Sequence, residues 1–126
     1  MNDLDVVSAI YAATAARDFA RALDLIDDDC VITQDERLPW GGRHVGPDGY
    51  GEFGRRLTGT VTSAVTTEAL FEADGDVIQF GRTRGTVNAN GAAFDIPEVH
   101  RWTVRDGKAV AAHFSIDTPA MLRAIG

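Results

Sequence analysis

The sequence predicts an α+β fold in which helices come first and an antiparallel sheet follows. Apolar side chains recur at helical spacing in the first third of the chain, whereas Val, Thr, Ile and Phe dominate from residue 60 onwards. Three Asn-Gly or Asp-Gly pairs interrupt this second part. Such pairs between apolar runs are typical of two-residue hairpin turns, because type I′ turns need a positive φ at both positions. Helices followed by an antiparallel meander indicate the α+β class.

Three helices are expected before the sheet and one after it. Asp3 is a suitable N-cap for the first helix, and Asp18 is suitable for a short second helix. Pro47 fits the first turn of the third helix, because proline has no N–H to lose there. Thr118 is expected to cap the last helix, with Pro119 in its first turn.

A short strand is expected within "DDDCVIT", and four longer strands form the meander. The turns predict these strands at about 60–73, 76–89, 92–105 and 108–117. The turns themselves are Asp74-Gly75, Asn90-Gly91 and Asp106-Gly107.

Two-residue turns also predict the pairing of the last hairpin, with His100 opposite His113. Because side chains alternate across a sheet, one face is expected to gather Ile96, Glu98, His100, Trp102, Val104, Ala109, Ala111, His113, Ser115 and Asp117. We interpret this ionisable face as the wall of a cavity beneath the helices. The opposite face carries Val99, Arg101, Val110, Ala112, Phe114 and Ile116. A second copy of the chain could cover its apolar side chains.

The composition excludes several classes of partner. The 126 residues are expected to form one domain, residues 1–126, and a net charge of −7 argues against nucleic acid. No apolar run approaches the length of a membrane helix, so no membrane is expected. The only cysteine, Cys30, cannot form an intrachain disulfide, which makes the cytoplasm the expected location. There is no phosphate loop or cofactor fingerprint, and no cofactor is expected.

Three passages resemble one superfamily: "SAIYAATAARDFARALDLIDDDCVIT", "GGRHVGPDGYGEF" and "HRWTVRDGKAVAAHFSIDTPAMLRAIG". Together they resemble the nuclear transport factor 2-like proteins, and within them the SnoaL-like polyketide cyclases and relatives of ketosteroid isomerase. The resemblance implies a cone-shaped fold, a curved antiparallel sheet wrapped around N-terminal helices, an interior pocket and usually a homodimer. It does not imply one function, since the superfamily includes isomerases, cyclases, hydratases, epoxide hydrolases and non-catalytic binders.

The resemblance also suggests roles for individual residues. Asp117 matches the acidic residue that ends the last strand and serves as the acid/base of the cyclases. His100 resembles their pocket histidine, and Tyr11 resembles a pocket tyrosine on the first helix. Asp35 falls near the general base of the isomerases, although the loop that follows is longer here.

The residue chemistry leaves alternatives open at each position. Asp117 in an apolar pocket would have a raised pKa and could exchange a proton with a carbon acid, or it could cap the last helix. Histidines 100 and 113, with Glu98 nearby, could act as acid/base groups, play a structural part or bind a metal; we expect no metal.

Tyr11, Glu98 and His113 are candidate substrate contacts, together with four further aromatic residues. Trp40 stands between Pro39 and two glycines, so it could form a lip over the pocket or plug the open end of the cone. Trp102 is either core or pocket wall, and Tyr50 and Phe53 belong to the apolar stripe of the third helix.

The sequence therefore predicts a cofactor-independent acid/base enzyme that acts on a small hydrophobic carbonyl compound. Asp117 or Asp35 would abstract a proton, and His100 or Tyr11 would donate a hydrogen bond to the developing enolate. The alternative is a dimeric binding or accessory domain without catalysis, whose pocket needs only apolar walls.

Overall fold

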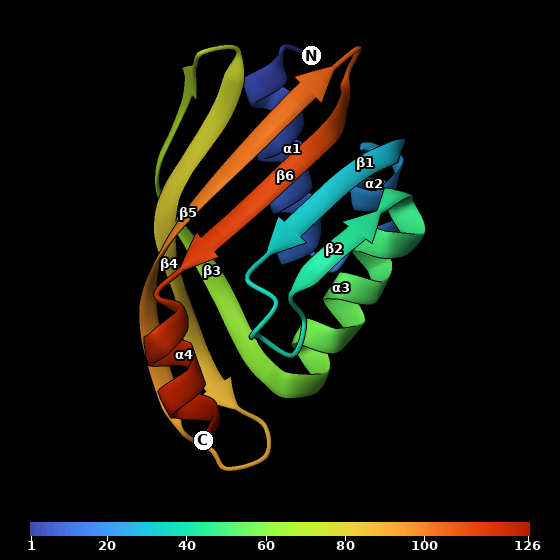
Figure 1. Cartoon of the computed structure of the whole chain (residues 1–126). Coiled ribbons are helices and arrows are strands. Elements are labelled where there is room, and N and C mark those ends of the chain that lie inside the picture. The colour runs from blue at the N-terminus through green and yellow to red at the C-terminus, as the bar shows by residue number, and fades with distance from the viewer.

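A computed structural model describes all residues, 1–126, and confirms the α+β class (Figure 1). Four helices and six strands follow one another in the order α1 Asp3–Ala15, α2 Phe19–Asp24, β1 Ile26–Gln34, β2 Gly42–Val45, α3 Gly46–Thr60, β3 Val61–Ala73, β4 Asp76–Val87, β5 Ala93–Arg105, β6 Lys108–Ile116 and α4 Thr118–Ile125. The short strand β2 was not expected; it pairs with β1 directly before α3.

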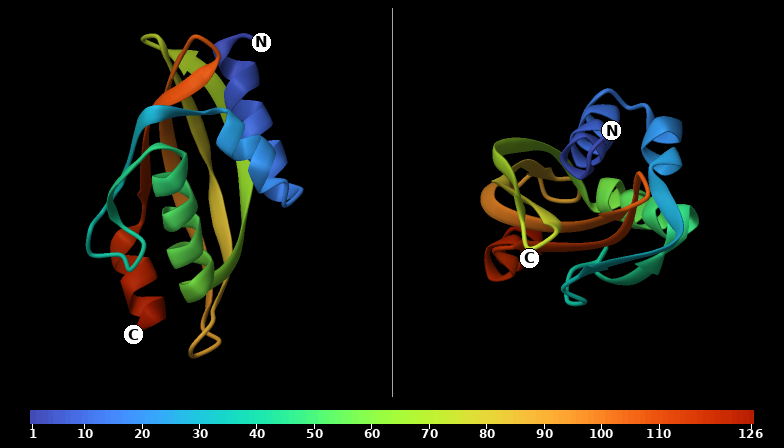
Figure 2. Two further views of the ribbon diagram at one scale, coloured as in Figure 1. Left: turned by 90° about the vertical axis from the view of Figure 1, so that its right-hand side faces the viewer. Right: turned by 90° about the horizontal axis from the view of Figure 1, so that it is seen from above.

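The six strands form one curved sheet in the order β2-β1-β6-β5-β4-β3. All neighbours are antiparallel except β1 and β6, which run parallel. The sheet bends around α1 and α3, as the view from above shows (Figure 2). Close strand contacts support this bend: a Cβ on Gly81 would lie 2.1 Å from the Thr66 carbonyl oxygen, so only glycine fits there. The concave side of the sheet and the helices enclose the core.

The helix N-termini show one confirmed cap and two corrections. Asp18 caps α2 as predicted, through a hydrogen bond from the Arg21 backbone N–H. Asn2, rather than Asp3, caps α1 in a reciprocal capping box. Asp117, rather than Thr118, caps α4, because its side chain accepts a hydrogen bond from Ala120 N. Thr118 is instead the first helical residue and is buried.

Two of the three predicted turns are confirmed. Asp74 and Asp106 both have φ near 52°, each followed by a glycine with positive φ, as type I′ turns require. Asn90-Gly91 lies instead in a longer loop, because Thr86 and Ala93 form the last pair before it. The β4–β5 register therefore differs by two residues from the expected one, which leaves every side chain on its predicted face.

A β-bulge in β6 overturns the predicted register of the last hairpin. Val104 pairs with Ala109 but Thr103 pairs with Ala111, so Val110 is an extra residue on β6. Beyond this bulge His100 lies opposite Phe114 instead of His113. A shift of one residue exchanges the two faces. His113, Ser115 and Asp117 are thus exposed, while Ala112, Phe114 and Ile116 turn towards the interior.

The outer face of the sheet exposes an apolar cluster. Phe71 and Phe80 pack edge to face, and Phe80 on β4 pairs with Val99 on the neighbouring strand β5. All three are more than a third exposed. A second copy could cover them, so the homodimer remains a prediction. None of the four helices is both long and apolar enough to cross a membrane.

Candidate functional site

A cavity of about 730 Å³ lies between the concave side of the sheet and helices α1 and α3. This volume suits a ligand of two or three fused rings. Seven of the ten residues singled out from the sequence line it: Tyr11, Trp40, Tyr50, Phe53, Glu98, His100 and Trp102. The other three, Asp35, His113 and Asp117, lie elsewhere.

A chain of polar contacts runs along one wall of the cavity. Trp102 Nε1–H donates to the Tyr11 hydroxyl oxygen at 2.9 Å, and that hydroxyl lies 2.6 Å from His100 Nδ1. The tyrosine oxygen accepts the tryptophan proton, and its own hydrogen can donate to Nδ1 when the histidine is the Nε2–H tautomer. His100 then carries its proton on Nε2, which lies 3.1 Å from Glu98 Oε2. Tyr11 thus fixes the orientation of the histidine ring.

Burial determines the protonation states of Glu98, His100 and Tyr11 along this wall. Glu98 is only 3% exposed, and burial raises the pKa of its carboxyl group to about 7, an effect that the neighbouring Gln79 side chain partly offsets. Burial also lowers the pKa of His100 to about 3 and raises the pKa of the Tyr11 hydroxyl well above its ordinary value. Near neutral pH the imidazole is therefore uncharged, and Glu98 is the group in the cavity that can gain or lose a proton.

The hydrogen bonds of this wall are incomplete. Glu98 Oε2 is close to His100 Nε2, yet the alignment falls short of a hydrogen bond, which leaves Oε2 buried without a partner. Gln79 Oε1 is likewise buried without a partner, although its Nε2 donates to Thr67 at 3.2 Å. Buried oxygens of this kind are rare in native proteins and often mark functional positions.

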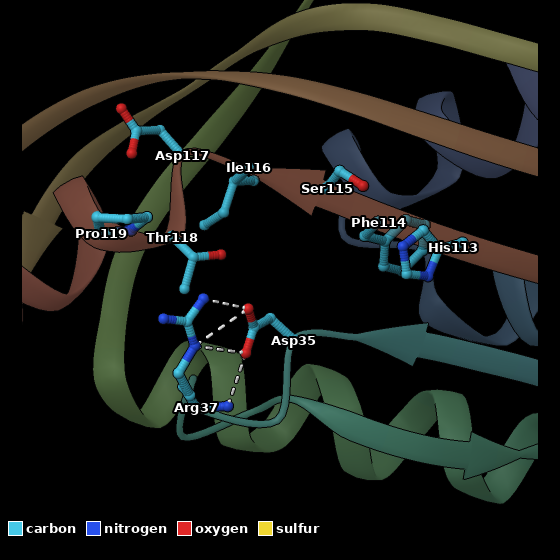
Figure 3. Close-up of a pocket in the computed structure, with 9 residues that line it drawn as sticks. All are labelled: Asp35, Arg37, His113, Phe114, Ser115, Ile116, Asp117, Thr118 and Pro119. Atoms are coloured by element: carbon cyan, nitrogen blue, oxygen red, sulfur yellow. Dashed lines mark hydrogen bonds and ion pairs between the residues drawn. The ribbon is translucent and has the colours of Figure 1, made fainter.

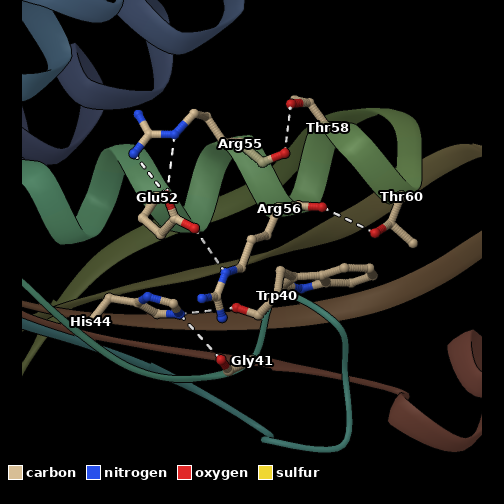
Figure 4. A network of polar contacts seen from close by, with 8 residues as sticks. All are labelled: Trp40, Gly41, His44, Glu52, Arg55, Arg56, Thr58 and Thr60. Carbon is tan, nitrogen blue, oxygen red and sulfur yellow. Dashed lines mark hydrogen bonds and ion pairs between the residues drawn. The ribbon is translucent and has the colours of Figure 1, made fainter.

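Trp40 belongs to the inner wall and is neither an exposed lip nor a surface plug. It is 2% exposed, and its Nε1–H donates to Gln34 Oε1 at 3.0 Å. His44 Nε2 lies within 3.2 Å of the carbonyl oxygens of Trp40 and Gly41, which ties the loop to β2 (Figure 4). Gly41 is required because a Cβ there would meet the Asp35 carbonyl oxygen at 1.8 Å.

Aromatic side chains form the apolar part of the wall. Phe114 lies between His100, at a centroid distance of 4.5 Å, and Trp102 and Phe53, both at 5.4 Å. The sequence placed Phe114 on the outer face, and the bulge in β6 explains why it faces inwards. A flat, ring-shaped ligand would find aromatic surface on both α3 and the sheet.

Asp35, His113 and Asp117 instead line a separate surface hollow of about 410 Å³, next to the point where β1 and β6 diverge (Figure 3). Arg37 pairs with Asp35 at 2.7 Å and lowers the pKa of that carboxyl group to about 2. His113 contacts Thr33 Oγ1 at 2.7 Å. These placements contradict the hypothesis that Asp35 or Asp117 is a base inside the cavity.

Two buried amides of the site were not identified from the sequence. Gln34 holds Trp40, and Gln79 lies beside Glu98. The alternation of β4 places Gln79 on the inner face, so it could have been found, whereas nothing in the sequence singled out Gln34. No group of three or more His, Cys, Asp or Glu side chains is arranged to hold a metal ion.

A curved, open sheet that covers helices and an internal cavity defines an NTF2-like protein. Residues 7–112 match the model of the SnoaL-like domain, so the chain belongs to the SnoaL-like family. No curated protein matches the chain.

Solved structures show the same architecture over the full length. An NTF2-like protein from Burkholderia thailandensis is 26% identical, with a TM-score of 0.94 over 100% of this chain and 98% of its own. TerC, co-crystallised with polyporic acid, is 25% identical, with a TM-score of 0.89 over 99% and 98% of the two chains. A provisional polyketide cyclase from Pseudomonas putida, at 16% identity and a TM-score of 0.85 over 100% and 99%, shows the shared fold alone.

Proposed function

We propose that this chain is an acid/base enzyme that needs no cofactor and acts on a small hydrophobic carbonyl compound. The observation that carries the proposal is the buried Glu98–His100–Tyr11 chain on the wall of the cavity. The base is Glu98 rather than the two aspartates indicated by the sequence, because Glu98 combines burial in the cavity with a pKa near neutrality.

The proposed reaction begins when the Glu98 carboxylate takes a proton from a carbon next to the carbonyl group. The electron pair of the broken C–H bond moves into the carbonyl and gives an enolate. His100, kept neutral by burial, is the proposed donor to the enolate oxygen through Nε2–H. The protonated Glu98 can then return the proton to another carbon, which is an isomerisation. In a substrate with a second carbonyl group, the enolate carbon can instead add to that carbonyl carbon; its C=O π bond breaks, and the protonated Glu98 gives its proton to the resulting alkoxide, which closes a ring.

The cavity also supports a second candidate, a binding domain without catalysis. Most of its wall is apolar, and TerC, a structure with the same fold, crystallised with polyporic acid. Binding alone would not require a carboxyl group with a pKa near 7 beside a buried, uncharged histidine. This difference favours the enzyme and makes Glu98 the residue that separates the two candidates.

Hydrogen–deuterium exchange provides a test that does not depend on the natural substrate. The chain is incubated in D₂O with a panel of bicyclic aromatic ketones such as 2-tetralone, and exchange at the carbon next to the carbonyl is followed by proton NMR. Wild-type chain is expected to accelerate exchange, and Glu98→Gln should reduce the acceleration about 100-fold or more, the usual contribution of a general base.

Asp117→Asn is the matched control, because Asn retains a capping oxygen for α4 and Asp117 lies outside the cavity. It should exchange at the wild-type rate. If Asp117→Asn rather than Glu98→Gln abolished exchange, the assignment of the base would be wrong. If the cavity bound the ketones or polyporic acid and no ketone exchanged faster than in buffer, the binding domain would be the correct function.

A further inference from the structure

Arg17 occupies a backbone position that normally requires glycine. It follows α1 in a Schellman motif, in which Arg17 N–H donates to the Thr14 carbonyl at 3.1 Å and Asp18 N–H donates to the Ala13 carbonyl at 2.8 Å. The residue at this position of the motif is left-handed, and Arg17 has φ 61°. Glycine adopts this conformation without cost, whereas a side chain is strained there. An arginine at this corner therefore needs another reason.

Arg17 both lines the cavity and is exposed to solvent, so it lies where the cavity opens. Among the residues that line the cavity, only Arg17 and Glu98 can carry a full charge under ordinary conditions. Arg17 is exposed and makes no ion pair, unlike Arg37, Arg55 and Arg82. Beside it, Phe19 lines the same mouth and is 50% exposed. The entrance thus presents an unpaired guanidinium next to an apolar ring, while Glu98 lies deep inside.

We propose that Arg17 is a specificity residue, which binds an anionic group on the ligand at the cavity mouth. The proposed substrate class, which rests on the proposed function, is a hydrophobic acid. Its apolar rings and carbonyl group lie between the aromatic walls, and its carboxylate or similar anion stays near solvent. A guanidinium suits this role because it binds carboxylates through two parallel hydrogen bonds.

An anionic ligand needs a local cation here, because the overall charge of the chain does not favour an anion. The chain carries a net charge of −7, so its long-range field repels an anionic ligand. A ligand that enters with its charged end outwards needs one favourable contact at the mouth. The interior suits the apolar end, because most of the residues that line the cavity are hydrophobic.

Two fluorescent probes of almost the same shape can separate charge from shape. One is 1-anilinonaphthalene-8-sulfonate, an anion, and the other is N-phenyl-1-naphthylamine, which lacks the sulfonate. Arg17→Gly is expected to weaken binding of the sulfonate about tenfold, as for the loss of one hydrogen-bonded ion pair. Binding of the neutral probe should stay unchanged. The melting temperature should rise by about 3 °C, because glycine relieves the backbone strain.

Arg21→Ala is the matched control, because it removes the same charge from the adjacent helix α2 at a position that does not line the cavity. If it weakened sulfonate binding as much as Arg17→Gly, only net charge would matter and the proposal would fail. Equal losses for both probes in Arg17→Gly would also overturn it, since Arg17 would then only shape the mouth. The proposal would also fail if the wild-type chain bound the neutral probe as tightly as the sulfonate, or more tightly.

The outcome can be distinguished from a failure of the proposed function. Glu98→Gln is judged by the exchange of 2-tetralone and Arg17→Gly by the ratio of the two probe affinities, and Arg21→Ala, which lies outside the cavity, should keep the wild-type result in both assays. If the wild-type chain did not accelerate exchange but still bound the sulfonate more tightly than the neutral probe, only the proposed role of Glu98 would be wrong. If the wild-type chain accelerated exchange but did not distinguish the two probes, only the proposed role of Arg17 would be wrong.

Discussion

Replacement of Tyr11 by phenylalanine is expected to lower the free energy of unfolding by about 3 kcal/mol. The Tyr11 hydroxyl accepts from Trp102 Nε1–H and lies in hydrogen-bonding contact with His100 Nδ1. Its removal leaves one donor and one acceptor unpartnered in the interior, and each costs roughly 1–3 kcal/mol. Urea unfolding at pH 7, followed by tryptophan fluorescence, measures the loss.

Tyr50→Phe is the control for this prediction. Tyr50 lines the same cavity, but its hydroxyl takes no part in the Trp102–Tyr11–His100 chain. It should cost clearly less than Tyr11→Phe. In addition, Tyr11→Phe should cost less in a His100→Phe background, because one of the two groups that it orphans is then absent. Equal losses of stability for the two tyrosine variants, or full additivity of Tyr11→Phe with His100→Phe, would show that the Trp102–Tyr11–His100 contacts contribute nothing to stability.

The second large effect is the pH dependence that Glu98 and His100 give to stability; the two contributions oppose each other in the wild type, so a change of Glu98 is needed to reveal them. The folded pKa of Glu98, about 7, lies above its unfolded value near 4.5, so the folded state holds this proton more tightly. The resulting stability is complete below pH 4.5 and is lost as the pH rises to 7. The change amounts to about 3 kcal/mol.

His100 acts in the opposite direction. Its folded pKa of about 3 lies below the unfolded value of 6.5, so the unfolded state binds this proton more tightly. Stability is therefore lost as the pH falls from 6.5 towards 3. Between pH 4.5 and 6.5 the two slopes have opposite sign and similar size, about 1.4 kcal/mol per pH unit, so the pair contributes almost no pH dependence in the wild type.

Glu98→Gln removes one of these slopes and exposes the other. Relative to the wild type, the variant should become less stable by about 3 kcal/mol as the pH is lowered from 6.5 to 4.5. Other titrating groups are common to both proteins and cancel in the difference. Urea unfolding at several pH values provides the measurement. A wild-type–variant difference that stays constant across this range would contradict the raised pKa of Glu98.

The sequence predicted those parts of the fold that depend on local patterns. The turns at Asp74 and Asp106 are encoded in two residues, and alternation within β5 correctly placed Glu98, His100 and Trp102 on the inner face. These inferences need no knowledge of neighbouring strands, because a turn type and a side-chain period are properties of a short segment.

The errors came from features that tertiary contacts decide. The bulge at Val110 has no signature in "KAVAAHFSI", yet it turns His113 outwards and brings Phe114 into the cavity. The choice between Asp117 and Thr118 as the cap of α4 was likewise open in the sequence. Glu98 was recognised only as a binding residue, since its burial and its raised pKa follow from how the sheet closes over it.

The most direct test of the account is a titration of the Glu98 carboxyl group itself. In protein labelled with ¹³C at the glutamate carboxyl carbon, the Glu98 signal is identified by its absence from the spectrum of Glu98→Gln, and its chemical shift is followed with pH. The account predicts a midpoint near pH 7. A midpoint near the ordinary glutamate value of about 4.3 would contradict it, because Glu98 would then be fully ionised at neutral pH and burial would not have raised its pKa.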